Sequence, residues 1–322
     1  MKKFFLIGLR VIDIIFSPIT LFVALWMRFI RLYQLRFWEL NGLLTKRIFN
    51  LVGVFPIINH YYEPLFDARL LKHSLRKDRD LPGINFNIDA QLNLLEKFNF
   101  NHEILEIDSR PKNKLTFSFN RGAFLSGDAE YLFNMIRLFK PQRIIEVGCG
   151  SSTLMIQHAI EYNKKDSAGY DCKHICIEPY ENDWLESLSV RVVRKVVEDV
   201  ALEEFMELDE NDILFIDSSH MIRPQGDVLF EFLNILPLLK KGVIVHIHDI
   251  FSPKDYLDEW LKKGVVFWNE QYLLEAFLSH NNAFEIIGAL NLLKHRNYKE
   301  LKTKCPMLLQ DREPGSFWIR RI

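Results

Sequence analysis

The segment Arg143-Ile144-Ile145-Glu146-Val147-Gly148-Cys149-Gly150-Ser151-Ser152-Thr153 decides the fold of this 322-residue chain. Residues 143–147 are mainly apolar and β-branched, which predicts a buried strand. Two glycines follow, and they permit a sharp turn and a close approach of the backbone to a ligand. The hydroxyl side chains that end the segment are suited to capping a helix, whose amino terminus favours an anionic group. The sequence therefore predicts a strand, a glycine turn and a helix that together form a binding loop.

Apolar strand segments alternate with helical segments from about residue 119 onward. Beyond residues 143–147, strands are expected near 174–177, 190–193, 213–216, 242–246, 284–287 and 316–320, with helices at 128–139 and 270–279. Runs of apolar strands separated by helices are typical of a mostly parallel sheet that is covered on both faces. The prediction is an α/β, Rossmann-like domain.

Acidic residues stand at or just after the ends of several predicted strands. In a doubly wound sheet, ligands bind at the carboxyl ends of the strands, so these side chains are expected to meet at one site. Glu178 is placed to accept hydrogen bonds from two ribose hydroxyls, and Asp199 is placed to meet an adenine amino group. The candidate cofactor-binding residues are Glu146, Gly148, Gly150, Ser151, Ser152, Glu178, Asp199 and Asp217.

Histidines follow the predicted strands 213–216 and 242–246. His220 and His248 are candidate catalytic bases, because imidazole takes up a proton near neutral pH. Asp217 and Asp249 are candidate ligands of a divalent cation, although they are equally suited to bonding the cofactor or loop amides. His246 alternates with apolar residues inside its strand, which predicts a packing role.

Several of these motifs together resemble a known enzyme class: residues 146–153, Glu178, 215–220 and 245–250. They are similar to the class I S-adenosylmethionine-dependent methyltransferases, and within them to the small-molecule O-methyltransferase branch that includes macrocin-type sugar methyltransferases. The resemblance extends over about residues 122–322. Ser152 departs from the pattern, because the third glycine of the loop usually stands at its position.

The resemblance implies a seven-stranded, mostly parallel sheet with its last strand reversed. It also implies S-adenosylmethionine as the cofactor and, as acceptor, a hydroxyl of a sugar, glycan or lipid-linked saccharide. Metal-dependent relatives imply a divalent cation such as Mg²⁺ at Asp217 and Asp249.

Two other functions fit parts of the same pattern. A NAD-dependent oxidoreductase also binds its cofactor at a glycine loop, but its fingerprint requires glycine where Thr153 stands. A non-catalytic scaffold at a membrane surface would be expected to have a broken loop or to lack the strand-end acids. Both features are intact in this sequence, so methyl transfer is the favoured prediction.

The first fifty residues are apolar and basic, with eight basic and two acidic side chains. Pro18 is expected to divide the apolar run into two short helices, 3–16 and 18–33, because proline removes a backbone donor. Basic residues at both outer ends favour a hairpin at the cytoplasmic face of a membrane, reached through residues 1–40. The alternatives are a helical extension that packs on the catalytic domain or on a sister subunit of a homo-oligomer, and a single membrane-spanning segment.

Composition bounds the remaining organisation. Residues 51–120 are predicted to be a linker with cover helices, including a charged helical stretch at 67–79 and an amphipathic helix at 89–98, and residues 121–322 the methyltransferase domain. A net charge of −1 argues against nucleic acid as a partner.

Four cysteines without paired zinc-type spacing indicate free thiols in a reducing cytoplasm. Residues 172–176 are predicted to be a buried strand and not a metal site, because no further ligand stands nearby in the sequence.

Overall fold

The computed structural model describes residues 2–36, 44–110, 115–264 and 266–322. The chain forms two compact units, Met1–Ser74 and Leu75–Ile322. The second unit contains the sheet, the helices that cover it and all candidate site residues.

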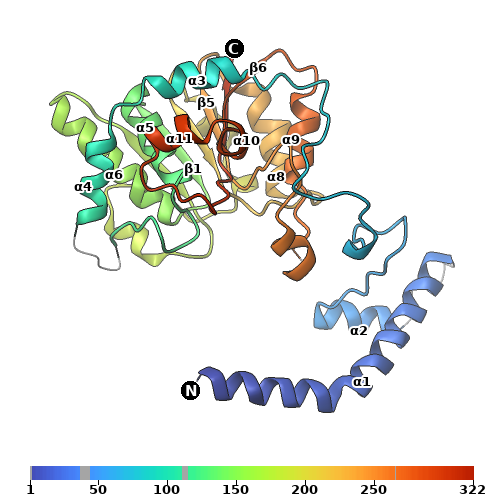
Figure 1. The fold of residues 1–322 in the computed structure, drawn as a ribbon. Coiled ribbons are helices and arrows are strands. Elements are labelled where there is room, and N and C mark those ends of the chain that lie inside the picture. The colour runs from blue at the N-terminus through green and yellow to red at the C-terminus, as the bar shows by residue number, and fades with distance from the viewer. Residues whose placement is uncertain (1, 37–43, 111–114, 265) are drawn as a thin grey trace. The chain divides into compact units, whose positions relative to one another are not determined.

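The first unit contains one long helix, α1 (Lys2–Arg36), followed by α2 (Leu44–Val52). The prediction of two short helices is wrong, because α1 continues through Pro18 and bends along its length (Figure 1). Pro18 cannot donate a hydrogen bond to the carbonyl of Ile14. The Ser17 hydroxyl donates to that carbonyl instead, at 2.8 Å. The predicted helix at 67–79 is also wrong, since only the short turn Ala68–Leu70 is helical there.

A seven-stranded sheet forms the centre of the second unit, in the order β3-β2-β1-β4-β5-β7-β6. The strands β1 to β5 pair in parallel, whereas β7 is antiparallel to both β5 and β6. The predicted reversal of the last strand is therefore confirmed. The bounds are β1 Arg143–Val147, β2 Lys173–Ile177, β3 Arg191–Val193, β4 Ile213–Ile216, β5 Ile244–Ile247, β6 Phe284–Ala289 and β7 Phe317–Arg321.

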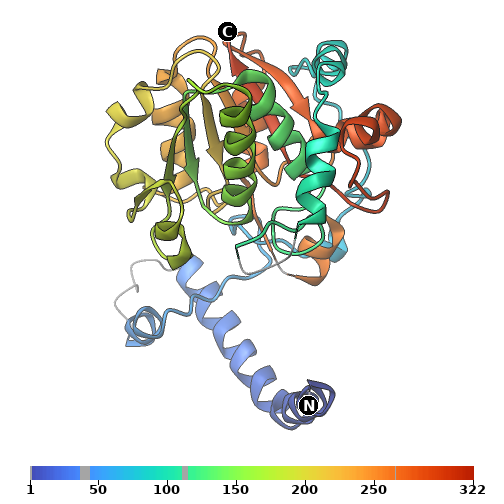
Figure 2. The same cartoon turned by 90° about the vertical axis from the view of Figure 1, so that its left-hand side faces the viewer.

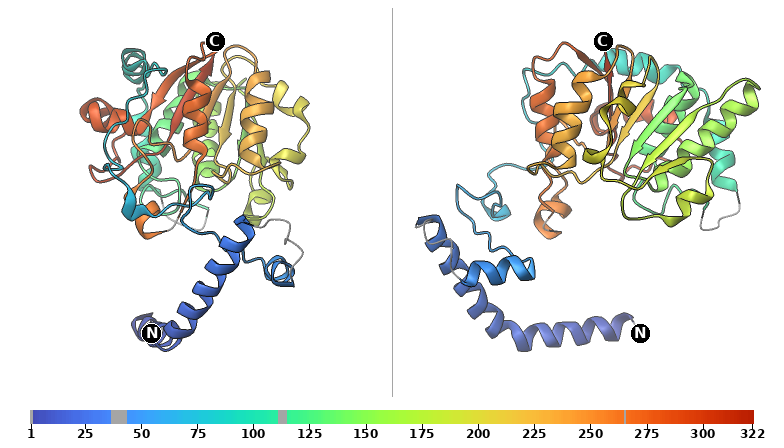
Figure 3. Two further views of the ribbon diagram at one scale, coloured as in Figure 1. Left: turned by 90° about the vertical axis from the view of Figure 1, so that its right-hand side faces the viewer. Right: turned by 180° about the vertical axis from the view of Figure 1, so that it is seen from behind.

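Helices cover both faces of this sheet, as the two opposite views show (Figures 2 and 3). One layer packs into the core that contains Phe215 and Trp318, and it consists of α3 (Ile88–Glu96), α4 (Asn101–Ser109), α5 (Asp128–Phe139), α6 (Ser151–Asp166), α10 (Leu290–Arg296) and α11 (Tyr298–Lys304). The other layer packs into the core that contains Ile216 and Ile247, and it consists of α7 (Leu202–Met206), α8 (Asp227–Phe230) with its π-helical continuation Glu231–Ile235, and α9 (Glu270–Leu278). Each strand thus buries alternate side chains on opposite faces.

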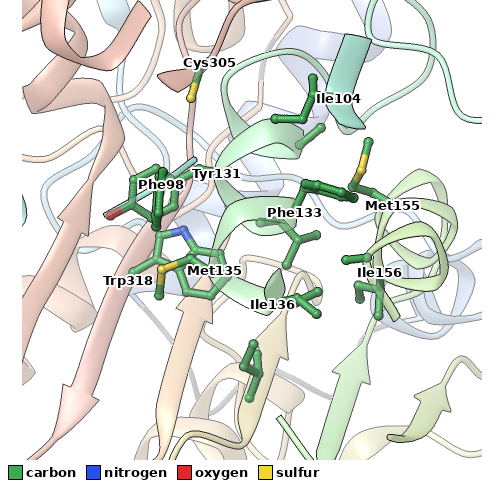
Figure 4. Packing of buried hydrophobic residues seen from close by; sticks show 14 of the residues in the cluster. Phe98, Ile104, Tyr131, Phe133, Met135, Ile136, Met155, Ile156, Cys305 and Trp318 are labelled. Carbon is green, nitrogen blue, oxygen red and sulfur yellow. The ribbon is translucent and has the colours of Figure 1, made fainter. Parts of the chain in front are cut away.

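Large aromatic side chains fill the core beneath α5 (Figure 4). Tyr131 packs edge-on against Phe98 at 5.0 Å, and its hydroxyl donates to the carbonyl of Ile287 at 2.9 Å. Trp318 of β7 lies 5.9 Å from the same ring. Each fully buried aromatic side chain contributes about 1.5–3 kcal/mol by leaving water. This packing fixes the sheet whose carboxyl ends carry the candidate site.

Candidate active site

Gly148 begins the loop that follows β1, and its conformation excludes any other residue. Its φ is +77°, and a Cβ at this position would lie 1.9 Å from the carbonyl oxygen of Asp217. The backbone can approach β4 this closely because glycine has no side chain. Neighbouring hydrogen bonds, from Gly148 to Ile177 and from Asp217 to Val147, hold the ends of three strands together.

The hydroxyl residues of the loop have three different roles. The Thr153 hydroxyl accepts a hydrogen bond from the amide of Gly150 at 3.0 Å, which caps the start of α6. Ser152 is buried, and its hydroxyl donates to Oε1 of Glu146 at 2.6 Å. Ser151 lines the adjoining cavity. The serine that replaces the usual third glycine therefore anchors the loop to β1.

A cavity of about 1130 Å³ opens at the carboxyl ends of β1 and β4. It brings together most of the predicted cofactor-binding residues, namely Gly148, Gly150, Ser151, Ser152, Glu178 and Asp217. Glu146 is not among its lining residues, because it is fully buried beneath the loop and bonds Ser152 and His174. The segment 116–124 forms much of the opposite wall.

Glu178 stands at the end of β2 and organises the turn that follows. Its Oε1 accepts hydrogen bonds from the amides of Tyr180 and Glu181, both at 3.0 Å, and its Oε2 accepts one from Cys149 at 3.3 Å. A carboxylate oxygen has further lone pairs, so these bonds fix the group without exhausting its capacity as an acceptor. Asn182 adds a hydrogen bond to the carbonyl of Cys149 at 2.7 Å.

Asp199 does not lie with the other predicted residues. It ends the short turn Val197–Asp199, is exposed to solvent and borders a separate cavity near Gln225. Its neighbour Glu198 lines a 250 Å³ pocket together with Glu178 and Asp217. The sequence pointed to this turn. Its backbone places Glu198, and not Asp199, in the pocket with Glu178 and Asp217.

A cluster of two aspartates and two histidines lies at the ends of β4 and β5. His220 Nε2 is 3.2 Å from Asp217 Oδ1 and 3.7 Å from Asp249 Oδ2. His248 Nδ1 is 3.3 Å from Asp217 Oδ1 and 3.7 Å from Asp249 Oδ1. Both histidines are buried. Asp217 is the residue of this cluster that also lines the large cavity.

The charges in this cluster stabilise one another. Burial opposes protonation of His220, but its hydrogen bonds to Asp217 and Glu270 outweigh burial and raise its pKa to about 10. Burial also opposes ionisation of Asp217, yet the positive charge of His248 and the bonds from both histidines hold its pKa well below its ordinary value. The protons on the two histidines therefore point toward Asp217 and Asp249. A cation at this place would meet the same carboxylate oxygens.

Sequence reasoning missed the partners that orient the histidines. Glu270 at the start of α9 is fully buried, and its Oε2 lies 2.8 Å from Nδ1 of His220. The Trp268 ring lies against the His220 imidazole, with centroids 4.4 Å apart. No role for either residue was apparent from the sequence. The packing role predicted for His246 is confirmed, since its ring stacks on Phe215 at 4.0 Å.

Comparisons with known proteins agree with this arrangement. Residues 145–250 match the model of a family described as a methyltransferase domain. A protein of Archaeoglobus fulgidus, itself uncharacterized, is 30% identical over 175 residues, which cover 50% of this chain and 76% of that protein.

Two solved structures also align with parts of the chain. One is a candidate protein-L-isoaspartate O-methyltransferase of Plasmodium falciparum in complex with S-adenosyl-L-homocysteine, 18% identical with a TM-score of 0.29, covering 49% of this chain and 83% of that one. The other is an S-adenosylmethionine-dependent methyltransferase of Anabaena variabilis, 14% identical with a TM-score of 0.29, covering 78% of this chain and all of that one.

The sheet order, the glycine loop and the cavity at the strand ends define a class I methyltransferase domain, the class that takes its methyl group from S-adenosylmethionine. This chain belongs to one family with the archaeal protein, and its residues 145–250 match the methyltransferase domain.

Proposed function

We propose that the protein transfers a methyl group from S-adenosylmethionine to a hydroxyl group of a sugar, glycan or lipid-linked saccharide, as the macrocin-type branch does. The observation that supports this most directly is the cluster of Asp217, His220, His248 and Asp249 beside the cofactor loop. A hydroxyl must lose its proton to attack a methyl group, and this cluster offers both a base and cation ligands.

The large cavity fits the cofactor and leaves room beside it. A Cβ placed on Gly150 would meet no heavy atom of the described residues within 4 Å, so the loop offers open space for a ligand. The volume exceeds the ~300–1,000 Å³ of a typical pocket for one small ligand, which suits a cofactor and an acceptor together. Asn120, Arg121 and Trp184 also line the cavity and present hydrogen-bonding groups and an aromatic face to a hydroxyl-rich ring.

The donor set fits a divalent cation such as Mg²⁺. One atom each of Asp217, His248 and Asp249 lies within 4.8 Å of the others. The two carboxylates are ligands that Mg²⁺ or Mn²⁺ prefers, whereas the imidazole is a ligand more typical of metals such as zinc or iron. Such a cation would bind the acceptor oxygen and lower the pKa of its hydroxyl.

His220 is the proposed base, and it accepts the proton of the acceptor once its own proton has left, because its raised pKa keeps the resting ring protonated. Its Nε2 faces the two aspartates, while its Nδ1 is held by Glu270. Glu270 thereby fixes the ring orientation and stabilises the proton that Nε2 receives. His248 faces the same aspartates through Nδ1. Its other ring nitrogen, Nε2, lies 4.0 Å from Asp128, a longer separation than the 2.8 Å between His220 and Glu270.

Binding and transfer test the proposal separately. Calorimetric titration with S-adenosylmethionine should show one site, and no binding at millimolar cofactor would overturn the proposed activity. With bound cofactor established, radiolabelled methyl groups should appear in the lipid-linked or polysaccharide fraction of cell envelopes. Label that appears in protein or nucleic acid alone would overturn the proposed acceptor. Loss of transfer with a chelator, restored by Mg²⁺, is expected if the cation takes part.

We also propose that α1 attaches the protein to the cytoplasmic face of a membrane. Residues Leu6–Arg36 form one helix that is long and apolar enough to cross a bilayer. Most of its described side chains are apolar and exposed, although Ile30 is buried and Arg10 and Asp13 are charged. Such a surface suits a helix in contact with lipid. Residues 37–40, the end of the predicted membrane segment, lie outside the described residues. Full-length protein that stays monodisperse in the supernatant without detergent would contradict this attachment.

A further inference from the structure

A second cluster of metal-ligand side chains lies beneath the cofactor loop, away from the aspartates. Glu146 of β1 stands directly beside Cys176 of β2 in the strand register, and His174 lies two residues earlier on the same face of β2. All three side chains are buried. The turn after β1 places Cys149 in the same small buried cluster as Cys176, with its thiol donating to the carbonyl of Glu146 at 3.7 Å. Sequence spacing concealed this set, because Glu146 and Cys149 come from another strand and its loop.

The distances in this cluster match those around a tetrahedral zinc ion. Cys176 Sγ is 3.5 Å from His174 Nε2 and 3.7 Å from Glu146 Oε2, and His174 Nε2 is 2.9 Å from Glu146 Oε2. Zinc bonded to sulfur at ~2.3 Å and to nitrogen or oxygen at ~2.0–2.2 Å separates such ligand pairs by about 3.6, 3.6 and 3.4 Å. The first two edges are therefore already in place, and the third must widen by about 0.5 Å.

The surroundings supply the support that zinc ligands need. Gln157 Nε2 lies 2.8 Å from Nδ1 of His174 and fixes the ring, while Ser152 holds the second oxygen of Glu146. Metal-bound histidines and carboxylates are normally oriented by such outer hydrogen bonds.

We propose that Glu146, Cys149, His174 and Cys176 bind a structural zinc ion that joins β1, β2 and the cofactor loop. Zinc replaces the protons of the two thiols and of His174 Nε2, so binding releases protons to solvent. Three ligand atoms already lie together, and the Cys149 thiolate would complete the tetrahedron by turning from the backbone carbonyls that it now contacts. Four protein ligands are the pattern of a structural site. This site shares no ligand with the Asp217 cluster, although Cys149 also lines the large cavity.

Metal content tests the site without any activity measurement. Full-length protein produced in zinc-supplemented medium and dialysed against a weak chelator should retain about one zinc per chain. Cys176→Ser should lose that zinc, whereas Cys172→Ser should keep it. Cys172 is a matched control, since it is a buried thiol just before β2 that packs in the other core cluster.

Cobalt substitution tests the wild-type chain, in case Cys176→Ser fails to fold. Tetrahedral cobalt bound by thiolates gives intense charge-transfer absorption, which ligation by aspartate and histidine alone does not give. Zinc retained equally by Cys176→Ser and Cys172→Ser would overturn the proposal. Wild-type protein that retains no zinc and shows no thiolate absorption with cobalt would overturn it as well, and would leave a buried Glu146–His174 ion pair in its place.

Discussion

Alanine at Gly148 should destabilise the fold and alanine at Gly150 should leave its stability nearly unchanged, although the two glycines are two residues apart. At Gly148, a side chain must adopt φ near +77°, which costs about 1–2 kcal/mol, and its Cβ must move away from the Asp217 carbonyl at 1.9 Å. We expect Gly148→Ala to destabilise the protein by about 2–4 kcal/mol and to displace Asp217. At Gly150, a Cβ meets no described heavy atom within 4 Å, so folding stability should change by less than ~0.5 kcal/mol.

Ligand affinity separates the two variants further. The methyl group of Gly150→Ala enters the space assigned to the cofactor, so the Kd for S-adenosylhomocysteine should rise at least ~10-fold, equivalent to ~1.4 kcal/mol. Gly169→Ala is the control, because its Cβ is equally free of described neighbours and Gly169 is not among the residues that line the cavity. Urea unfolding and calorimetry measure both quantities. A Gly150→Ala variant that binds like the wild type would refute the placement of the cofactor.

Three further outcomes are expected. His220→Ala should lower kcat by about 10²–10⁴ with unchanged S-adenosylhomocysteine affinity, and a loss below 10-fold would reassign the base to His248. Glu270→Gln removes the charge that raises the pKa of His220, so the acidic limb of the pH–kcat profile should move to lower pH; an unshifted limb would exclude this coupling. Burial works to raise the pKa of Glu313, but hydrogen bonds from Lys294, His295 and Asn291 lower it to about 2, below the ordinary value of 4.5. Its ionised form therefore stabilises the fold above pH 4.5, and this contribution is lost as pH falls toward 2. Glu313→Gln should cost about 1–2 kcal/mol in urea unfolding at pH 7, after allowance for solvent exposure, and the difference from wild type should shrink below pH 4.5.

Local patterns predicted the catalytic fold closely because its strands are continuous apolar runs. The expected strand 213–216 matches β4, and the helix 128–139 matches α5. The prediction failed at Pro18, where propensity indicated a break but the Ser17 hydroxyl satisfies the freed carbonyl. It failed again at 67–79, where the spacing of charged residues suggested a helix. Such a helix would have no apolar face to bury against the core.

The candidate site was predictable to the extent that strand ends converge. Position along the strands identified Glu178, Asp217 and Asp249, because parallel strands present their carboxyl ends at one edge. Which of two adjacent residues faces the pocket depends on the backbone conformation of the turn. The sequence alone therefore could not distinguish Glu198 from Asp199 as the residue at the pocket. Glu270 lies 50 residues from His220, and only the packing of α9 on the sheet brings them together.

The position of β7 between β5 and β6 has a kinetic consequence. Strand β6 precedes β7 in the chain, yet β7 is its partner in the sheet, so β6 cannot join until β7 has inserted. The same step delivers the Gly315 carbonyl to the amide of Ile250, which fixes the backbone beside Asp249. Long-range pairings of this kind form late. On refolding, compact protein should therefore accumulate before binding of the proposed cation is recovered, with β7 insertion as the step that completes the site.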